Sequence, residues 1–594
     1  MPMLKRPWEK YEPFIGPNLS NRTWPSGTIK NAPRWLTTDL RDGNQSLASP
    51  MSISQKWIYF NLLVGLGYKE IEVSTPTASA TEYGFTRQLI ETPGAVPDDV
   101  WLQVLCPCRL DLIQQTVESL KGANKVIISL YFAASPVWLD TVFGLSQQDV
   151  YDRVVEAVAY AKSITKEDPS QQGTAWNLMF SPEAFSGSDM GYCLRLCEAT
   201  KAIWAPTVEN PIILNLPATV EMSTPNVYAD QVEIFSTSIS ERDKVCVSLH
   251  VHNDRGSAVA AAELGLLAGA ERIEGCLFGN GERSGNVDLV TLALNLYSQG
   301  IDPGVSFSDI SLVRAVVEEI TDIRVHPRAP YAGNLFFTAY SGAHQDAINK
   351  GLAKFKARSG EGQRLWKVPY LSMDPQDLGL SRDDIIRVNS QSGKGGVAWT
   401  LSNELHVDLP RGLQLQFSKT VKEASEAYFT SEPDSRIISA DVRQVNESEN
   451  GDCHKSYGDR KLVAVTGTSE GEAYKIVNAL VNVKGITQRL EGKGTDVISA
   501  LTNSLASTPI SNVTFSVARC DLVPALGELK ALLVVECQAG NRGQSGWGVR
   551  SCDDSDASAT LAALSSALCE LLGSTNFNMQ AVSNLGVVLD IPSP

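Results

Sequence analysis

The sequence predicts an α/β protein whose largest part is a TIM (β/α)8 barrel, followed by helical subdomains and a C-terminal α+β domain. Two observations predict the barrel. Eight short apolar runs lie between residues 34 and 278, and each is followed by a stretch with the helical spacing of apolar residues. Uninterrupted apolar runs are typical of parallel strands that are buried on both faces. Eight strand–helix units over roughly 250 residues match the size of such a barrel.

The elements are expected in the following order. Residues 1–33, rich in Pro, Asn and Trp, are expected to form an irregular N-terminal arm, and residues 34–330 the catalytic barrel. The eight predicted strands are Arg34–Thr38, Tyr68–Val73, Trp101–Leu105, Lys125–Tyr131, Ala175–Phe180, Ile212–Leu216, Val245–Leu249 and Arg272–Phe278.

The barrel pattern stops near residue 330. Residues 331–420 are expected to form subdomains that combine helical stretches with two polar segments, His344–Lys350 and Asn389–Gly396. A charged, Ser-rich stretch at 421–458 predicts a flexible linker. Residues 459–594 predict an α+β domain of a regulatory type, in which the expected strands include Lys461–Val465 and Leu532–Glu536 and the expected helices Glu470–Leu480 and Ala557–Leu572.

The composition excludes several classes of function. The net charge is −16, with 67 acidic against 51 basic residues, which argues against nucleic acid as a partner. No apolar stretch reaches the 18 or more residues of a membrane span, so no membrane partner is expected. Eleven scattered cysteines form no disulfide framework, and Met1–Phe14 lacks the apolar core of a signal peptide. We expect a cytoplasmic protein with reduced thiols, and leave an organelle address, such as a mitochondrial one, open.

Polar residues follow the predicted strands where a barrel carries its chemistry. In this fold the active site lies at the carboxyl ends of the strands. The polar residues found there are Asp39, Arg41 and Asp42 after the first strand, Ser181 and Glu183 after the fifth, Asn215 and Thr219 at the sixth, His250 and His252 at the seventh, and Gly279, Asn280, Gly281, Glu282 and Asn286 after the eighth.

The segment His250-Val251-His252 predicts a metal site. Side chains two residues apart on a strand point to the same side, so both imidazoles can bind one ion. The chain has only six histidines, which makes this pairing informative. Together with the Asp42 carboxylate, the pair suits a divalent cation that acts as a Lewis acid. Mg²⁺, Mn²⁺ and Zn²⁺ all fit this mixed set of ligands. Two structural histidines are the alternative interpretation.

Arg41 lies between two carboxylates, Asp39 and Asp42. A guanidinium beside a metal can bind a 2-oxo acid and polarise its carbonyl group, because its planar fork matches a carboxylate. A simple salt bridge to Asp39 or Asp42 is the alternative.

Two glycine-rich segments match no nucleotide-binding motif. Gly393-Lys394 lacks the first glycine of a phosphate-binding P-loop, since that position is Val388. Gly279-Asn280-Gly281 lacks the third glycine of a dinucleotide fingerprint. Its glycines are expected to let the backbone approach a ligand at the mouth of the barrel.

Four motifs together resemble those of 2-isopropylmalate synthases and of their relatives, the homocitrate and citramalate synthases. The resemblance is closest to the longer form found in fungi and many bacteria, and it is strong over the barrel and the subdomains after it. The C-terminal domain matches weakly. The motifs are Asp39–Gln45 (DLRDGNQ), Asn215–Glu221 (NLPATVE), His250–Gly256 (HVHNDRG) and Gly279–Asn286 (GNGERSGN).

The resemblance implies an acyltransferase that condenses acetyl-CoA with a 2-oxo acid and then hydrolyses the thioester, giving a 2-substituted malate and free CoA. It implies a homodimer in which the subdomain after the barrel completes the partner's active site. Its implied residues are Asp42, His250, His252 and Asn286 for the metal, with Mg²⁺ favoured; Arg41, Glu183, His344 and Tyr370 for catalysis; Asn215, Thr219, Ser181, Tyr131 and Leu105 for the substrate; and Gly279, Asn280 and Gly281 for the loop on the CoA side.

The sequence departs from the family where the side chain of the 2-oxo acid should lie. Thr75 replaces a Phe after the second strand, and Ser129 replaces a His on the fourth. Both changes remove volume, which favours a bulky or aromatic substrate such as phenylpyruvate or its 4-hydroxy form. The alternative is the enzyme of leucine biosynthesis, which uses 3-methyl-2-oxobutanoate. Val251 between the metal histidines and Pro327 after His326 are further departures.

Two other classes of function remain to be separated from this one. A metal-dependent aldolase similar to hydroxymethylglutaryl-CoA lyase would share the metal site, but the subdomain carrying His344 and Tyr370 argues against it. A non-catalytic homologue should have lost Arg41, Asp42 or a metal histidine, and none is lost. In the C-terminal domain the family binds leucine, but Gly492–Thr495 and Trp547–Arg550 look altered, so leucine control is not carried over to this chain.

Overall fold

The computed structural model describes residues 14, 16–17, 19–360, 365–382 and 385, together with segments of the C-terminal part (475–483, 486–494, 499, 502–503, 513–521, 531–539 and 544–552). The chain divides into two compact units. The first comprises Met1–Phe337 with Met373–Leu380, and the second Thr338–Ser372 with Ser381–Pro594. Each unit is described by itself.

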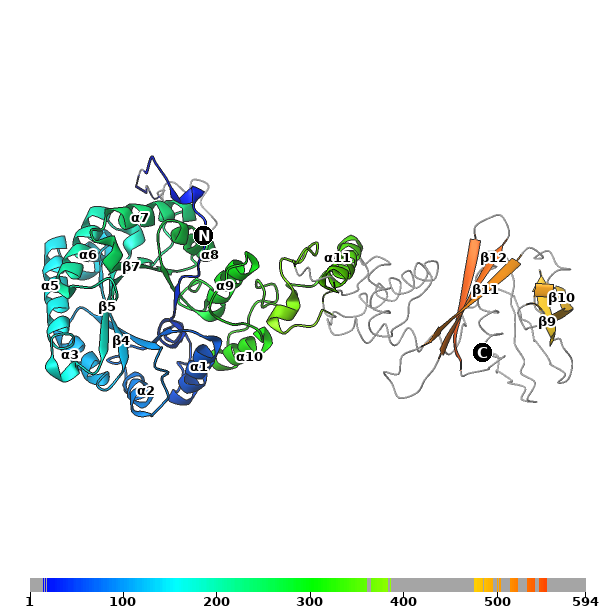
Figure 1. Cartoon of the computed structure of the whole chain (residues 1–594), viewed down its shortest axis with the longest axis horizontal. Coiled ribbons are helices and arrows are strands. Elements are labelled where there is room, and N and C mark those ends of the chain that lie inside the picture. The colour runs from blue at the N-terminus through cyan, green and yellow to red at the C-terminus, as the bar shows by residue number, and fades with distance from the viewer. Residues whose placement is uncertain are drawn as a thin grey trace, which may run out of the picture. The chain divides into compact units, whose positions relative to one another are not determined.

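The first unit is the predicted closed barrel of eight parallel strands. The strands lie in sequence order, and β1 pairs with β8 to close the ring (Figure 1). Their bounds are β1 Arg34–Thr37, β2 Glu70–Ser74, β3 Trp101–Pro107, β4 Lys125–Ala133, β5 Ala175–Glu183, β6 Ile212–Ala218, β7 Val245–Val251 and β8 Arg272–Gly275.

Helices surround the barrel on its outside (Figure 1). Polar residues mark several of their starts: Ser52 forms a capping box with Gln55, and Ser146 forms one with Asp149. The helices are α1 Ile53–Leu66, α2 Ala80–Glu91, α3 Leu110–Ser119, the single turn α4 Pro136–Trp138, α5 Gln147–Ser163, α6 Met190–Trp204, α7 Pro225–Ser238, α8 Ala258–Leu267, α9 Leu289–Ser298 and α10 Ile310–Thr321.

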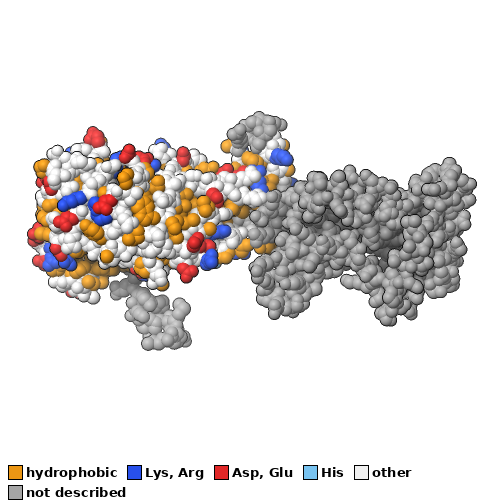
Figure 2. All heavy atoms as spheres, turned by 90° about the horizontal axis from the view of Figure 1, so that it is seen from below, with side chains coloured by type: hydrophobic (Ala, Val, Ile, Leu, Met, Phe, Trp, Pro, Cys, Tyr) orange, Lys and Arg blue, Asp and Glu red, His pale blue; other side chains and the backbone are white. Residues whose placement is uncertain are grey.

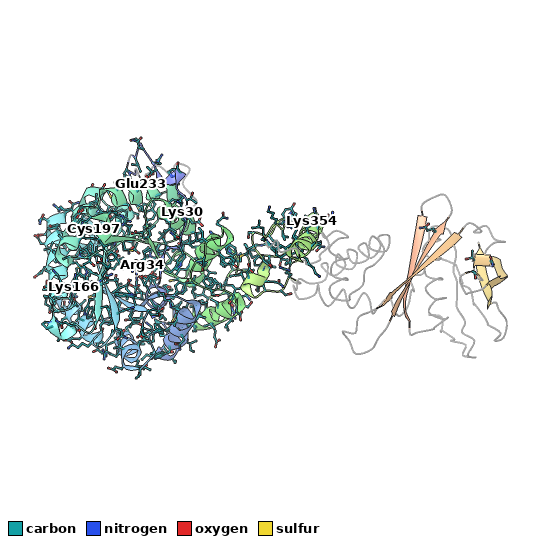
Figure 3. All side chains as sticks on the ribbon, viewed as in Figure 1. Lys30, Arg34, Lys166, Cys197, Glu233 and Lys354 are labelled. Carbon is teal, nitrogen blue, oxygen red and sulfur yellow. The ribbon has the colours of Figure 1, made fainter. Side chains whose placement is uncertain are left out.

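Side chains fill the ring of strands, which looks open in the ribbon (Figure 3). Ile127, Met179, Ile213 and Cys246 pack into one buried cluster, from four neighbouring strands. Strand side chains alternate between the two faces, so residues two positions further along each strand face the interior nearer its carboxyl end. On β4 to β7 these residues are Ser129, Ser181, Asn215 and Ser248. The interior therefore changes from apolar to polar toward the mouth.

Two strands differ from their predicted bounds. The eighth strand ends at Gly275 rather than Phe278, and Leu277–Gly279 forms a 3-10 turn instead. The backbone N–H of Leu277 donates to the carboxylate of Asp39, which draws the chain away from the ladder. The second strand begins at Glu70 rather than Tyr68, and its pairing with β3 shifts register between Glu72 and Ser74. This irregularity lies directly before Thr75.

The N-terminal arm is anchored to the outside of the barrel. Apart from one 3-10 turn at Trp24–Ser26, its described residues are irregular, as predicted. Arg22 makes a bidentate contact with Asp230 of α7, and the Trp24 indole N–H donates to the same carboxylate at 2.9 Å. The Thr23 backbone N–H donates to Glu233, also on α7, at 2.9 Å (Figure 3).

The second unit contains helix α11 (Gly342–Gly360) and five strands among its described residues. Strands β9 (Lys475–Val483) and β10 (Ile486–Gly494) form an antiparallel pair. Strands β11 (Val513–Asp521), β12 (Ala531–Ala539) and β13 (Gln544–Cys552) form a three-stranded antiparallel sheet. The predicted strand Leu532–Glu536 lies within β12. The predicted linker at 421–458, the segments Asn389–Gly396 and Lys461–Val465, and the helix Ala557–Leu572 lie outside the described residues.

The prediction of a helix at Glu470–Leu480 is wrong, because residues 475–483 form strand β9. The segment is rich in β-branched residues, namely Ile476, Val477, Val481 and Val483, which favour a strand. Each residue of β9 pairs with one of β10, so a hairpin partner was available nearby in the sequence.

The barrel unit presents a mixed surface on the face seen in Figure 2. Acidic and basic side chains are interspersed there with hydrophobic ones, and no extended basic area is visible. Within the described part of the chain, no helix is both long enough and apolar enough to cross a membrane.

Candidate active site

Asp42, His250 and His252 come together at the carboxyl ends of β1 and β7. The atoms with which they could bind a metal all lie within 4.8 Å of one another, and all three residues are buried. His250 and His252 project to the same side of β7, as the spacing predicts, with ring centroids 5.3 Å apart. Their clustering with Asp42 disfavours the interpretation as two unrelated structural histidines.

The two nitrogens of His250 face different groups. Its Nε2 lies 3.4 Å from Asp42 Oδ2 and 3.1 Å from the amide oxygen of Asn286. Its Nδ1 lies 3.2 Å from Glu274 Oε2, on β8. Burial disfavours the charged imidazole, but Asp42 and Glu274 outweigh it and raise the pKa of His250 to about 10. A cation at Nε2 would take the place of that proton, with Glu274 fixing the ring from behind.

His252, in contrast to His250, disfavours the protonated form of its imidazole. Burial, together with the charge of His250, lowers the pKa of His252 to about 4. Its buried Nδ1 has no hydrogen-bond partner among the described residues. A buried nitrogen without a partner is costly, and a bound ligand removes that cost.

Asn286 is held against the histidines by the loop after β8. A bridge pairs Asn286 with His252, and the Asn286 side-chain N–H donates to Asp42 Oδ2 at 2.8 Å. The glycines of the predicted CoA-side loop make this packing possible. A Cβ on Gly281, which has φ +153°, would lie 2.4 Å from the Asn286 amide. One on Gly285 would lie 1.9 Å from the Gly279 carbonyl oxygen. These glycines thus allow the loop to seat Asn286, and their expected approach to a ligand stays a prediction.

Arg41 makes the salt bridge to Asp42 that was considered as its alternative role, and also contacts a residue that the motifs did not indicate. Its Nη1 donates to Asp42 Oδ1 at 2.5 Å, and its Nε donates to Glu72 Oε2, on β2, at 2.5 Å. Burial works against ionised Asp42, but the charge of Arg41 dominates and holds the pKa of that carboxyl well below its usual range. Asp42 is therefore an anion at neutral pH.

A buried lysine holds the turn that carries Arg41 and Asp42. Residues Asp39–Gly43 form one wide helical turn after β1. The ammonium of Lys56, on α1, donates to the carbonyl of Leu40 within this turn at 2.8 Å and to the carbonyl of Val73 at 3.2 Å. It also pairs with Glu82 of α2 at 2.6 Å. The lysine has three N–H donors and all three are used, so it ties the Arg41 turn to the end of β2.

The residues assigned to the 2-oxo acid carboxylate lie on β5 and β6 or just after them. The Asn215 side-chain N–H donates to Ser181 Oγ at 3.2 Å, and the buried Asn215 Oδ1 has no partner among the described residues. Thr219 Oγ1 accepts from the backbone of Ala184 at 2.9 Å. Glu183 ends β5, and burial raises the pKa of its carboxyl while Arg41 opposes the shift. A raised pKa suits a group that exchanges protons near neutral pH.

The residues assigned to the substrate side chain lie on β2 to β4. Ser74 pairs with Val104, and Leu105 pairs with Ser129, so Thr75, Leu105 and Ser129 follow one another at one level of the sheet. Ser129 is fully buried, and its hydroxyl has no partner among the described residues. Tyr131, two residues further on, is half-buried at the mouth.

His344 and Tyr370 meet in the second unit. His344 lies in α11, and its ring stacks on Tyr370 with centroids 3.9 Å apart and an angle of 21° between the planes. Tyr370 has a side chain that is 63% exposed and a φ of +64°. A bulky residue rarely adopts this backbone conformation, which a functional constraint commonly maintains.

Comparison with known proteins decides the family. The chain is 48% identical to a 2-isopropylmalate synthase of Saccharomyces cerevisiae over 516 residues, covering 87% of this chain and 82% of that protein. The chain belongs to the 2-isopropylmalate synthase family. It is also 54% identical to a protein of Aspergillus rugulosus called isopropyl malate synthase htyA, over 69% of this chain and 70% of that one. A relative of S. cerevisiae called 2-isopropylmalate synthase 2, mitochondrial, is 47% identical over 87% of this chain and 84% of its own.

Two family models match different parts of this chain. The model described as HMGL-like matches residues 32–317, and that described as alpha-isopropylmalate synthase, post-catalytic domain-like, matches residues 334–402. A solved hydroxymethylglutaryl-CoA lyase of Pseudomonas aeruginosa shares 19% identity and a TM-score of 0.41, over 50% of this chain and 96% of that one. As a synthase of this family, the protein is an acyltransferase that condenses acetyl-CoA with a 2-oxo acid.

Several buried polar residues hold the site residues in place but were not indicated by the sequence motifs. These are Glu72, Gln103, Arg272, Glu274 and Lys56, and all five are fully buried. A signal for four of them was present, because charged or amide side chains interrupt runs that otherwise predict buried strands. Such residues are rarely buried without a partner, so their position in the runs indicates a polar network inside the barrel.

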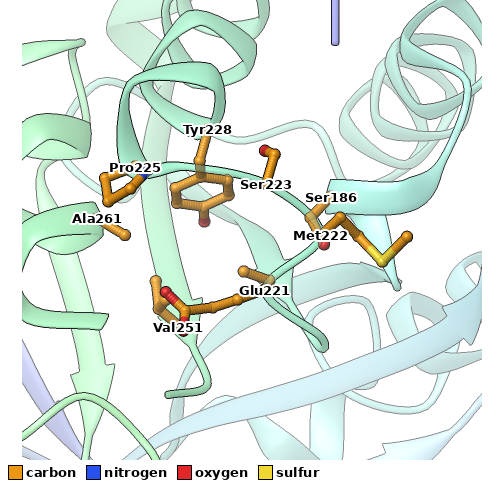
Figure 4. A pocket seen from close by; sticks show the side chains of 9 residues that line it. Ser186, Glu221, Met222, Ser223, Pro225, Tyr228, Val251 and Ala261 are labelled. Carbon is orange, nitrogen blue, oxygen red and sulfur yellow. The ribbon is translucent and has the colours of Figure 1, made fainter. Parts of the chain in front are cut away.

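A small crevice lies behind β7, the strand that carries His250, and is enclosed by β6, α7 and α8. Figure 4 shows Val251, Glu221 and Tyr228 around it, and its free space of about 10 Å³ is enough for a single water molecule. Val251 points into it, on the opposite side of β7 from the two histidines. The departure from the family's usual Pro at this position therefore faces the helical layer.

Proposed function

We propose that the 2-oxo acid condensed by this synthase is bulky or aromatic, of the phenylpyruvate type, and that the product is a benzylmalate-type acid. The observation that carries the proposal is a contrast within one barrel mouth. The residues that we assign to the metal and to the carbonyl group, Asp42, His250, His252 and Arg41, form a closely packed cluster. The positions beside the substrate side chain, Thr75 and Ser129, carry small residues where the family carries Phe and His.

The described residues fit a divalent cation. Asp42, His250 and His252, with the Asn286 oxygen beside them, would hold it, and the unpartnered Nδ1 of His252 is consistent with a missing ligand. The mixture of one carboxylate and two imidazoles suits Mg²⁺, Mn²⁺ or Zn²⁺, and we favour Mg²⁺. When bound, the ion acts as a Lewis acid toward the carbonyl oxygen of the 2-oxo acid.

The protein residues then have distinct tasks. Arg41 donates toward the carbonyl oxygen, where negative charge develops as the bond forms. Asn215, Thr219 and Ser181 orient the carboxylate of the 2-oxo acid. A base removes a proton from the methyl group of acetyl-CoA, whose carbon then bonds to the carbonyl carbon of the 2-oxo acid. Water finally hydrolyses the thioester and releases CoA as a thiol.

His344, Tyr370 and Glu183 are the groups we assign to proton transfer. The raised pKa of Glu183, caused by burial, supports its part. His344 and Tyr370 stack directly on each other, so each ring holds the other in position. The roles of these two residues come from the resemblance to the family. The same resemblance underlies our proposal of a homodimer, whereas the composition, with its scattered cysteines, underlies our proposal of a cytoplasmic location. Sedimentation of the full chain and fluorescence imaging of a tagged chain test these two points.

The space for a larger substrate is proposed on the Ser129 side of the mouth. A hydroxyl that is buried without a partner among the described residues, as Ser129 Oγ is, costs free energy unless a hydrogen-bonding group reaches it. Tyr131 lies two residues further along β4, so its half-buried ring is on the same face of the strand as Ser129. An aromatic ring beside the substrate suits an aryl group.

The second candidate is the leucine-pathway enzyme that uses 3-methyl-2-oxobutanoate. The identity of 46–49% to several bacterial and yeast 2-isopropylmalate synthases over most of the chain favours it.

A substrate panel separates these candidates. Purified full-length protein, acetyl-CoA and Mg²⁺ are mixed with 2-oxo acids from pyruvate to phenylpyruvate and its 4-hydroxy form, and free CoA is followed with a thiol reagent. We expect the highest kcat/KM with an aryl acid. The highest kcat/KM with 3-methyl-2-oxobutanoate would return the protein to leucine synthesis. Release of CoA with none of the acids would contradict the proposal as a whole.

A further inference from the structure

A chain of buried hydrogen bonds runs from the metal histidine into the barrel interior. Glu274 contacts His250 Nδ1 at 3.2 Å through one oxygen, and its other oxygen accepts from Arg272 at 2.6 Å. Arg272 is itself fully buried, and it also donates to Glu70 at 2.6 Å, to Gln103 Oε1 at 2.7 Å and to Ser248 Oγ at 3.0 Å. The metal ligand is thus fixed by a carboxylate that is in turn fixed by an arginine.

A second chain runs from the substrate arginine into the same interior. Arg41 Nε donates to Glu72 Oε2 at 2.5 Å, and the other oxygen of Glu72 accepts from the side-chain N–H of Gln103 at 2.9 Å. Both Glu72 and Gln103 have no exposed surface. The guanidinium of Arg41 is thereby held by a carboxylate that depends on Gln103.

Gln103 is the one neutral group at which the two chains meet. Its oxygen accepts from Arg272, which has no acceptor of its own, and its nitrogen donates to Glu72, which has no donor when ionised. These partners fix the orientation of the amide. Turning it over would place the Gln103 NH₂ group against the Arg272 donor and the Gln103 oxygen against the Glu72 carboxylate. With Arg41 Nη1 on Asp42 and Asp42 beside His250, the contacts close into a ring.

We propose that Gln103 is a positioning residue that joins the orientation of Arg41 to that of His250, so that the carbonyl-polarising cation and the metal ligand are held as one unit. The inference rests on the metal site of the proposed function. Gln103 touches neither the substrate nor the metal ligands, and it acts through Glu72 on one side and through Arg272 and Glu274 on the other. Groups that orient metal ligands commonly change metal affinity by about 10–100-fold when removed.

Two substitutions distinguish positioning from packing. Gln103→Leu keeps similar bulk and removes both hydrogen bonds. Gln103→Glu keeps the acceptor for Arg272, and because two buried carboxylates in contact share a proton, its O–H donates to Glu72 in place of the amide. A packing role predicts that both variants behave as the wild type does. A positioning role predicts that Gln103→Leu is impaired and that Gln103→Glu is the milder change.

The test measures binding of Mn²⁺ alone to the full-length metal-free protein by calorimetry, and then KM for the 2-oxo acid. Gln231→Leu is the matched control, since Gln231 is a buried glutamine of α7 that donates to the Ser186 carbonyl outside the barrel interior. We expect the Mn²⁺ dissociation constant to rise about tenfold or more in Gln103→Leu, together with KM, and both to change less in Gln103→Glu. The control should bind Mn²⁺ as the wild type does.

Wild-type Mn²⁺ affinity and KM in folded Gln103→Leu would overturn the inference. If Gln103→Leu fails to fold, Gln103→Met decides the question, because it has the length of the original side chain and also lacks both hydrogen bonds. Failure of the proposed function has a different signature: the wild type itself would bind no Mn²⁺ at the Asp42 cluster and would release no CoA.

Discussion

The two sides of the barrel mouth are built differently. On the side of β1, β7 and β8, charged groups are bound to one another: Arg41 contacts Asp42 and Glu72, and His250 lies between Asp42 and Glu274. On the side of β2 to β4, Thr75 and Ser129, which we propose lie beside the substrate, are small, and the Ser129 hydroxyl lacks a partner among the described residues. A side chain that has several charged partners cannot change alone, whereas one without partners can. The chemistry is therefore constrained, and the choice of substrate is open to variation.

The largest expected effect is loss of a metal ligand. His250→Ala should lower kcat/KM for CoA release by about 10³-fold or more, because the charge that develops on the carbonyl oxygen loses its main stabilisation. Mn²⁺ binding measured by calorimetry should disappear with it. His326→Ala is the control, as an exposed histidine whose Nδ1 contacts only the backbone N–H of Arg328 among the described residues. Full activity of His250→Ala would show that the cluster is not the metal site.

Removing the buried lysine should lower stability. Lys56→Met leaves Glu82 and two backbone carbonyls without their donor, and breaking a buried charge pair costs about 3–5 kcal/mol. Urea unfolding of the full chain measures the loss, and the fraction of activity that survives at low denaturant shows whether the Arg41 turn has moved. Lys69→Met, which removes an exposed pair with Asp99, is the comparison and should change stability by less than about 1 kcal/mol.

Refilling the pocket should change the choice of substrate without abolishing the chemistry. Thr75→Phe restores the bulk that the family carries, so kcat/KM for an aryl 2-oxo acid should fall relative to that for 3-methyl-2-oxobutanoate by about tenfold or more. The ratio is measured by CoA release with each acid at limiting concentration. An equal loss for both acids would mean that Thr75 supports the site generally and does not select the substrate.

The smallest expected effect concerns the unpartnered hydroxyl. Ser129→Ala removes a buried polar atom that makes no hydrogen bond within the described residues, so the free energy of unfolding should stay within about 1 kcal/mol of the wild type or rise. Urea unfolding without substrate measures it. A loss of several kcal/mol would indicate that Ser129 has a partner, and would remove the contrast between the two sides of the mouth.

Much of this arrangement was predictable from the sequence because it follows local patterns. Apolar runs predicted all eight strands, and the spacing of His250 and His252 predicted that both would face the interior. The end of β8 was not predictable in this way. Leu277 and Phe278 continue the apolar run, but a hydrogen bond from Leu277 to Asp39, 238 residues away, ends the strand at Gly275.

The supporting network was not predicted because its members are far apart in the sequence. Arg272 reaches Gln103 across 169 positions, and only the closed barrel brings them together. The prediction of a helix at Glu470–Leu480 was wrong for a related reason. Its apolar residues fit both periodicities, and pairing with β10 decided in favour of a strand.

A direct competition tests the central claim that the chemistry is retained while the substrate pocket is widened. The full-length protein receives acetyl-CoA, Mg²⁺ and equal concentrations of phenylpyruvate and 3-methyl-2-oxobutanoate, and the two malate products are quantified by mass spectrometry. The product ratio equals the ratio of the two kcat/KM values. We predict an excess of the benzylmalate product. An excess of 2-isopropylmalate would contradict the account and assign the protein to leucine synthesis.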